Sequence, residues 1–335
     1  MTPTVLALSP PRFSAPPLAP TLSVVVPLFN EHENLPTLYS RLVDALDPLG
    51  EAFELVFVND GSRDATSAML DLLAATDTRV TALHLSRNFG HQAAVTAGLD
   101  HARGDAVVVM DGDLQDPPEV LPQFVEKWRA GHEVVYAVRR KRKEGPLKRL
   151  GYFTFYRVLR AVADLEIPLD SGDFCLMDRQ VVDQLRALPE RVRFVRGLRT
   201  FVGFRQVGVE YERDARAAGR SKYTFRKLVG LAVDGILNFS SYPLRLVTYL
   251  GLLSAAAAAG LAAWAVWDAV SNQSTPRGWA STIVVVLFMG AIQLISLGVV
   301  GEYVRRIFLE VKGRPPYIVG RVARRAEARH ENRAA

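Results

Sequence analysis

Two aspartates separated by one glycine, Asp111 and Asp113, follow directly after an apolar run that is typical of a buried strand. Gln115 adds a neutral oxygen two residues further along the chain. Two carboxylates this close repel each other unless a divalent cation or solvent lies between them. The pattern therefore predicts a divalent-cation site, and a turn before a helix that starts near Pro117 is the alternative interpretation.

Polar residues also follow two other apolar runs. Asn30 and Glu31 come at the end of the run at 22–29, and Asp60 follows the run at 53–58. In a doubly wound sheet the carboxyl ends of parallel strands meet at the edge where ligands bind. We therefore expect an acidic rim that accepts hydrogen bonds from a base and a ribose. Helix capping by Asn30 and Asp60 is the alternative.

The elements that must position these residues are short β-branched runs that alternate with amphipathic stretches. The runs predict strands at 22–29, 53–58, 80–85, 106–110 and 133–138, with helices at 34–46, 64–75 and 92–102. This alternation is typical of an α/β fold with a Rossmann-like, mostly parallel sheet and helices on both faces. Neither a G-x-G-x-x-G nor a G-x-x-x-x-G-K-[ST] motif is present, which argues against dinucleotide redox and P-loop chemistry.

Two long apolar segments lie nearer the C-terminus. Residues 246–267 contain no charged side chain, and residues 279–301 contain only Gln293 as a strongly polar group. About 20 helical residues span the hydrocarbon core of a bilayer, so both segments are long enough. Small residues at helical spacing in the first segment favour close helix packing, which leaves a homo-oligomer open. We expect two transmembrane helices, at about 246–267 and 279–304.

The composition divides the chain into five parts. They are a disordered leader at 1–20, an α/β domain at 21–222, interfacial amphipathic helices at 223–243, the two transmembrane helices within 244–308, and a basic tail at 309–335. Lys and Arg residues flank both ends of the apolar hairpin, whereas Arg277 is the single basic residue in its connecting loop. The positive-inside rule then predicts a multi-pass inner-membrane protein with its α/β domain and both termini in the cytoplasm.

The charge and cysteine content exclude other classes of protein. The net charge is +6, and the segment from residue 305 onward, with nine basic and three acidic residues, accounts for all of it. The rest of the chain is neutral overall, which argues against a nucleic-acid-binding body. The single cysteine, Cys175, allows no internal disulfide and is expected to be a small core residue.

Several runs of sequence together resemble one known family. They are PLFNEHEN (27–34), FVNDGSRDAT (57–66), LSRNFGHQAAVTAGLDHARGD (85–105), MDGDLQDPPE (110–119), SGDFCLMDR (171–179) and RAAGRSKYTF (216–225). These runs are similar to those of the family-two, nucleotide-sugar-dependent glycosyltransferases, which have the GT-A fold. Within that family the chain resembles the polyprenyl-phosphate (dolichol-phosphate-type) sugar synthases of the membrane-anchored bacterial branch.

The resemblance implies a role for each matching residue. Nucleotide-sugar binding falls to Pro27, Phe29, Glu31, Val58, Asp60, Asp111, Gly112 and Arg139, and metal binding to Asp111, Asp113 and Gln115. Catalysis involves Asp113, together with Arg216 and Lys222 on a mobile loop that closes over the donor. Asp173 lies where the family places its candidate base, and with a phosphate acceptor it could instead orient the reacting groups.

The implied reaction is an inverting transfer of a sugar from a UDP- or GDP-linked donor to a polyprenyl (undecaprenyl-type) phosphate. It would use Mg2+ or Mn2+ and occur at the cytoplasmic face of the lipid bilayer, giving a lipid-linked sugar. Two alternatives stay open at this point. One is a membrane glycosyltransferase with a hydroxyl or polysaccharide acceptor, and the other is a non-enzymatic scaffold or flippase-associated protein.

Overall fold

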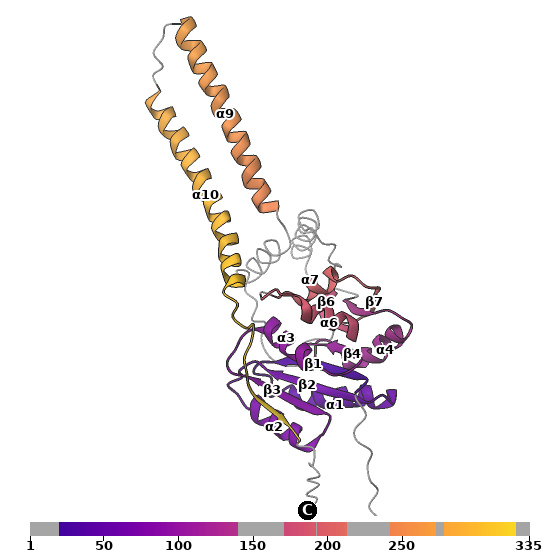
Figure 1. The fold of residues 1–335 in the computed structure, drawn as a ribbon. Coiled ribbons are helices and arrows are strands. Elements are labelled where there is room, and N and C mark those ends of the chain that lie inside the picture. The colour runs from indigo at the N-terminus through magenta and orange to yellow at the C-terminus, as the bar shows by residue number, and fades with distance from the viewer. Residues whose placement is uncertain (1–19, 140–170, 192, 213–241, 273–277, 326–335) are drawn as a thin grey trace, which may run out of the picture.

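A mixed sheet of eight strands forms the centre of the protein (Figure 1). The computed structural model describes residues 20–139, 171–191, 193–212, 242–272 and 278–325. The strands are β1 (Leu22–Leu28), β2 (Phe53–Asn59), β3 (Val80–Leu85), β4 (Ala106–Val109), β5 (Val134–Arg139), β6 (Ser171–Asp178), β7 (Gln206–Tyr211) and β8 (Val319–Arg324). Their order in space is β7-β5-β6-β4-β1-β2-β3-β8.

The strands predicted from the sequence are all present, and each begins and ends within one residue of its expected position. Four neighbouring pairs are parallel, β4 with β1, β1 with β2, β2 with β3, and β5 with β7. β6 runs antiparallel to both β4 and β5, and β8 runs antiparallel to β3. The antiparallel β6 is important for the site, because its beginning lies beside the end of β4.

Helices cover both faces of the sheet, as the alternating pattern predicted. They are α1 (Leu35–Leu46), α2 (Thr66–Thr76), α3 (His91–His101), α4 (Leu121–Arg129), α6 (Arg179–Ala187) and α7 (Val195–Phe201). The apolar sides of α1, α2 and α4 form one core with alternate residues of β1, and those of α3, α6 and α7 form the other. Cys175 is buried in this second core, as expected for a small packing residue.

Glycine allows one of these helices to lie very close to the sheet. A Cβ atom at Gly98, in the middle of α3, would overlap Cγ1 of Val25 on β1. Because no larger residue fits, α3 packs directly on the central strand and its first turn is held beside the strand ends.

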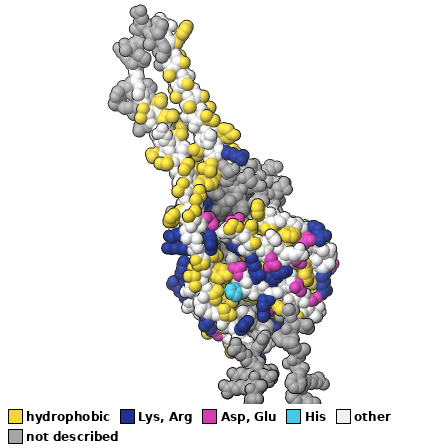
Figure 2. All heavy atoms as spheres, in the orientation of Figure 1, with side chains coloured by type: hydrophobic (Ala, Val, Ile, Leu, Met, Phe, Trp, Pro, Cys, Tyr) yellow, Lys and Arg dark blue, Asp and Glu magenta, His cyan; other side chains and the backbone are white. Residues whose placement is uncertain are grey.

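Two long helices, α9 (Tyr242–Asn272) and α10 (Trp279–Val311), form a hairpin that projects away from the sheet (Figure 1). The windows Tyr242–Trp264 and Val284–Val311 are long and apolar enough to cross a membrane. Their large apolar side chains are exposed along the hairpin (Figure 2). Both helices are longer than predicted, since α9 begins four residues earlier and α10 continues to Val311.

The sequence predicted a basic tail at 309–335, and the structure adds a strand within the part of it that is described. After α10 the chain returns to the catalytic domain and adds β8 to the edge of β3, with Val322 opposite Leu83. Arg321 makes two contacts to Asp71 of α2, at 2.6 and 2.8 Å. Arg321, one of the basic residues of this segment, is therefore paired at the sheet edge. Residues 1–19 of the predicted leader at 1–20, and residues 223–241 of the predicted interfacial segment at 223–243, lie outside the described residues.

Candidate active site

The candidate site lies where β1, β2 and β4 end and where β6 begins. In the β4–β6 register Val109 lies opposite Cys175, so continuing the pairing by two residues brings Asp111 towards Asp173. The first turn of α3, which follows β3, lies in the same region. Its first residue, His91, lies 3.7 Å from Asp111 and 3.2 Å from Asp173. Carboxylates from two distant parts of the sequence are thus brought together around one histidine.

The surroundings of Asp111 destabilise its ionised form. Burial, together with the negative charges of Asp116, Asp173 and Asp113, raises its pKa to about 6, and His91 offsets part of this effect. Its side chain nevertheless remains 35% exposed, so a ligand can reach it. A carboxylate that is destabilised in this way gains from a bound cation.

The loop at 111–115 is shaped by close packing. A Cβ atom at Gly112 would overlap Cδ2 of Leu28 at the end of β1, so the loop requires glycine between its two aspartates. Leu114 has a positive φ of 59°, and the N–H of Gln115 donates to Oδ1 of Asp113 at 3.2 Å. The close approach of Gly112 to Leu28 holds this loop against the end of β1.

The predicted metal ligands Asp111, Asp113 and Gln115 form a set of oxygen donors, which suits Mg2+ or Mn2+. Within the described ranges, no group of three or more His, Cys, Asp or Glu side chains is arranged to hold a metal ion. The metal site stays a prediction that is supported by donor chemistry and by the raised pKa of Asp111.

Asp173 is surrounded by donors. Its carboxylate accepts from Nε2 of Gln92 at 3.1 Å and from Nε of Arg196 at 3.3 Å, and it lies 3.2 Å from Nε2 of His91. Burial alone would raise its pKa, but the His91 hydrogen bond and the charges of Arg196 and His91 hold the pKa well below its usual range. A carboxylate stabilised this strongly in its ionised form is a poor proton acceptor.

The residues around Asp173 show what the sequence did and did not reveal. His91 is the first residue of α3. Its imidazole also faces both carboxylates, and burial is outweighed by Asp173, Asp111 and Asp60, so its pKa is raised. Gln92 was not predicted, and it connects three elements because its Oε1 accepts from the N–H of Val195 at 2.9 Å.

Asp60 fixes the loop that leads into α3. Its two oxygens accept from the N–H groups of Phe89 at 2.7 Å and Gly90 at 3.0 Å, directly before His91. Burial raises its pKa, and these two hydrogen bonds oppose the effect. Its contact with a nucleotide stays a prediction, and the structure adds a role in positioning the start of α3. Neighbouring Gly61 has a φ of +67°, and a Cβ there would lie 2.6 Å from the main chain of Arg87.

The loops after β1 and β2 are joined to each other. The N–H of Asn30 donates to Oγ of Ser62 at 3.0 Å, and the N–H of Glu31 donates to Oγ1 of Thr66 at 3.0 Å. Oε2 of Glu31 accepts from Nδ2 of Asn34 at 2.7 Å. The predicted acidic rim is therefore an ordered surface made from two strand ends.

The other predicted nucleotide-binding residues differ in how far they are exposed. Pro27 and Val58 lie opposite each other on β1 and β2 and are buried, and their contact with a nucleotide stays a prediction. Phe29 is partly exposed at the end of β1. Arg139 ends β5, and only its main chain is described. Arg216 and Lys222 lie outside the described residues.

The fold is that of a glycosyltransferase with the GT-A fold. Residues 23–186 match the family described as "Glycosyl transferase family 2", and residues 242–307 match the "GtrB C-terminal hairpin". The chain belongs to glycosyl transferase family 2. Both the catalytic class and the two-helix hairpin predicted from the sequence are confirmed.

Three curated relatives match this chain over almost their whole length. The chain is 47% identical over 298 residues to "Uncharacterized glycosyltransferase YkcC" of Bacillus subtilis, covering 89% of this chain and 92% of that protein. It is 44% identical over 299 residues to the "Bactoprenol glucosyl transferase" of Shigella phage SfII, covering 89% and 97%. It is 43% identical over 302 residues to the "Prophage bactoprenol glucosyl transferase homolog" of Escherichia coli, covering 90% and 99%.

Proposed function

We propose that this enzyme transfers a sugar, with inversion, from a nucleoside-diphosphate sugar to the phosphate of a polyprenyl lipid. The observation that carries the proposal is that the likeness to bactoprenol glucosyl transferases covers both the catalytic domain and the hairpin. A lipid acceptor explains why a catalytic sheet is joined to two helices that are long and apolar enough to cross a membrane. Because those relatives are named for glucose transfer, UDP-glucose is the first donor to test.

The chain provides separate groups for the diphosphate and for the nucleoside of the donor. Asp111, Asp113 and Gln115 would hold a divalent cation, which when bound supplies Lewis-acid stabilisation of the diphosphate leaving group. The acidic rim formed by Glu31 and Asp60 would receive the nucleoside through hydrogen bonds.

The acceptor makes a catalytic base unnecessary. A lipid phosphate is largely ionised at neutral pH, so it can attack the anomeric carbon without first losing a proton to the enzyme. The lowered pKa of Asp173 agrees with this chemistry. We therefore assign Asp173 a positioning role, in which it fixes His91, Gln92 and Arg196 around the reacting phosphates.

The cationic loop and the topology complete the proposal. Arg216 and Lys222 would close over the donor and meet the acceptor phosphate, since charge-assisted hydrogen bonds to phosphate are strong. The catalytic domain and both termini would lie in the cytoplasm, where nucleotide sugars are available. The basic residues on both sides of the hairpin support this orientation.

The test is a transfer assay with the full chain in detergent, undecaprenyl phosphate, and radiolabelled UDP-glucose or other nucleotide sugars. We expect label in an organic-soluble, mild-acid-labile product, and no such product from the Asp113→Asn variant. Label in an insoluble polymer or a water-soluble glycan would contradict the lipid acceptor. Absence of both transfer and nucleoside diphosphate release across the donor panel would favour the scaffold alternative.

A further inference from the structure

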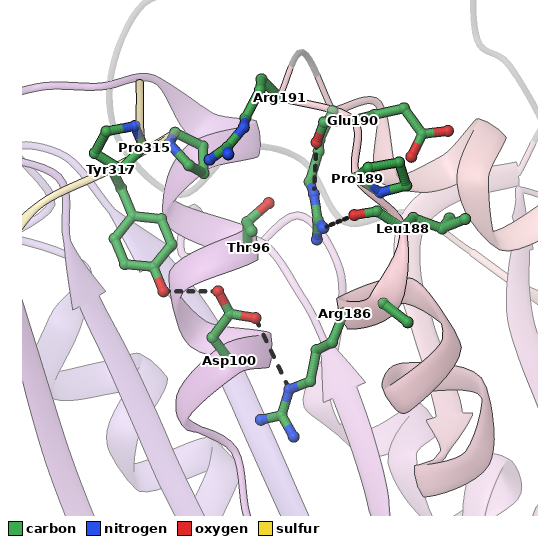
Figure 3. A pocket seen from close by; sticks show the side chains of 12 residues that line it. Thr96, Asp100, Arg186, Leu188, Pro189, Glu190, Arg191, Pro315 and Tyr317 are labelled. Carbon is green, nitrogen blue, oxygen red and sulfur yellow. Dashed lines mark hydrogen bonds and ion pairs between the residues drawn. The ribbon is translucent and has the colours of Figure 1, made fainter. Parts of the chain in front are cut away.

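A second cavity lies away from the strand ends, between α3, the end of α6 and the chain that follows α10 (Figure 3). Its volume is about 500 Å3, and its lining includes Arg186, Arg191, Arg193, Asp100 and Tyr317. Gln92 of the active site and Asp100 of this cavity are both on α3, eight residues apart. At 1.5 Å per residue this separates them by about 12 Å along the helix. The cavity begins at Thr96, whose hydroxyl donates to the carbonyl oxygen of Gln92 at 2.8 Å, and extends along α3 away from the reacting groups.

The arginines of this cavity are oriented mainly by neutral acceptors. Arg193 donates to the carbonyl oxygens of Glu190 at 3.1 Å and Leu188 at 2.8 Å. Arg186 donates to the carbonyl oxygen of Leu99 at 2.5 Å. Carbonyl groups fix the guanidinium plane of Arg193 without cancelling its charge, whereas Arg186 is also paired with Asp183 at 3.4 Å.

The acidic groups of the lining neutralise only part of this charge. Asp100 lies 3.8 Å from Nε of Arg186 and also accepts from the hydroxyl of Tyr317 at 2.7 Å. Nε of Arg186 is buried and makes no hydrogen bond among the described residues. The Arg191 side chain is exposed and has no hydrogen bond or ion pair within the same ranges. The lining contains three arginines and two carboxylates, Asp100 and Glu190, so its charged side chains sum to a net positive charge.

The position of the cavity indicates where its ligand comes from. The N–H of Arg191 donates to Oε2 of Glu310, in the last turn of α10, at 2.8 Å. Pro315 follows Val311, the end of the candidate span, by four residues, which reach at most about 14 Å. Headgroups occupy the zone just outside the hydrocarbon core. Figure 2 shows Lys and Arg side chains where the hairpin meets the catalytic domain.

We propose that this cavity binds the phosphate of an anionic phospholipid headgroup at the membrane surface. Guanidinium groups are well suited to phosphate, because their planar N–H donors match its oxygens. The volume is in the usual range for small-ligand sites and leaves room for the glycerol part of a headgroup. A lipid held here contacts the end of α6 and the segment after α10 together, and so fixes the catalytic domain at one height above the bilayer.

The test compares lipids by their effect on the thermal stability of the full chain in detergent. A ligand that binds only the folded state raises the Tm with its concentration. We expect phosphatidylglycerol to raise the Tm and phosphatidylcholine, which has no net charge, to have little effect. Arg191→Glu should weaken the phosphatidylglycerol response at least tenfold in lipid concentration, because it replaces a charge-assisted contact by repulsion.

Arg324→Glu is the matched control, since Arg324 is an exposed arginine at the far end of β8. It makes the same change of charge and should keep the full phosphatidylglycerol response. An unchanged response in Arg191→Glu, or an equal loss in Arg324→Glu, would overturn the site. A Tm rise with inorganic phosphate at the concentration effective for the lipid would show a soluble-anion site and overturn the lipid assignment. Sugar transfer is measured separately, so this result does not depend on the proposed function.

Discussion

Comparing Asp173→Asn with Arg196→Ala distinguishes a positioning role for the Asp173 carboxylate from a role as catalytic base. The Asp173→Asn variant keeps the size of the side chain and removes the negative charge that His91 and Arg196 face. If Asp173 acts by positioning, Arg196→Ala should impair the enzyme in the same way, because it removes the other half of the same contact. If Asp173 were the base, Arg196→Ala would leave it in place and make it more basic, since the arginine lowers its pKa.

The size of the effect follows from the contacts. Asp173 is only 16% exposed, so solvent screens its contact with Arg196 little. One charge-assisted hydrogen bond contributes about 1.5–3 kcal/mol, which corresponds to about a tenfold to hundredfold loss of rate. The double variant should be scarcely worse than the more damaged single variant, because both changes remove one interaction.

The assay measures kcat and KM for the lipid phosphate and the nucleotide sugar in each variant, with the Tm as a check on folding. We expect the loss in kcat, little change in the KM of the nucleotide sugar, and partial recovery in Arg196→Lys. The reasoning is refuted if Arg196→Ala retains wild-type kcat while Asp173→Asn loses activity by several orders of magnitude.

Four further outcomes are expected. Asp113→Asn and excess chelator should each abolish transfer, and full activity in EDTA would remove the metal role. Lys222→Ala should lower transfer about tenfold to hundredfold with an unchanged Tm, measured at limiting donor and lipid phosphate. Glu54→Ala should lower the free energy of unfolding by about 1–3 kcal/mol in denaturant titration, because buried Glu54 accepts hydrogen bonds from Ser23 and Arg103. The side chain of Arg103 is more exposed than that of Glu54, so Arg103→Ala should lower the free energy of unfolding by less. A reporter inserted at Ser274 should give a non-cytoplasmic signal and a C-terminal one a cytoplasmic signal, and the reverse would contradict the topology.

Strands β1 to β5 and helices α1, α2, α3, α9 and α10 could be predicted because their patterns are local, whereas β6 and β7 were not predicted. The apolar run at 80–85 has the same bounds as β3, and Asp64 accepts from the N–H of Thr66 at 3.1 Å at the start of α2. β8 was missed because Val319–Arg324 contains two arginines and reads as a basic tail. Its strand conformation depends on the exposed edge of β3 and on Asp71, which lie far away in the sequence.

The candidate site was predicted at the strand ends but not in its connections. Parallel strands align their carboxyl ends, so Asp60 and Asp111 could be placed in one region from order alone. The Asp173 cluster depends on β6 running antiparallel to β4 and on α7 returning beside α3. Such pairings join residues about 80 to 100 positions apart, and no local pattern specifies them.

The edge strand after the hairpin makes membrane insertion part of the folding of the catalytic domain. Arg321 and Asp71 are 250 residues apart, so at about 5–20 residues per second the ribosome completes β8 roughly 10 to 50 seconds after α2. Until then the outer edge of β3 has no strand beside it, and an open edge of this kind invites pairing with other chains. Both apolar helices are synthesised during the same interval. The sheet therefore gains its last strand only after the helices have been made, and a delay in their insertion would prolong the exposure of that edge.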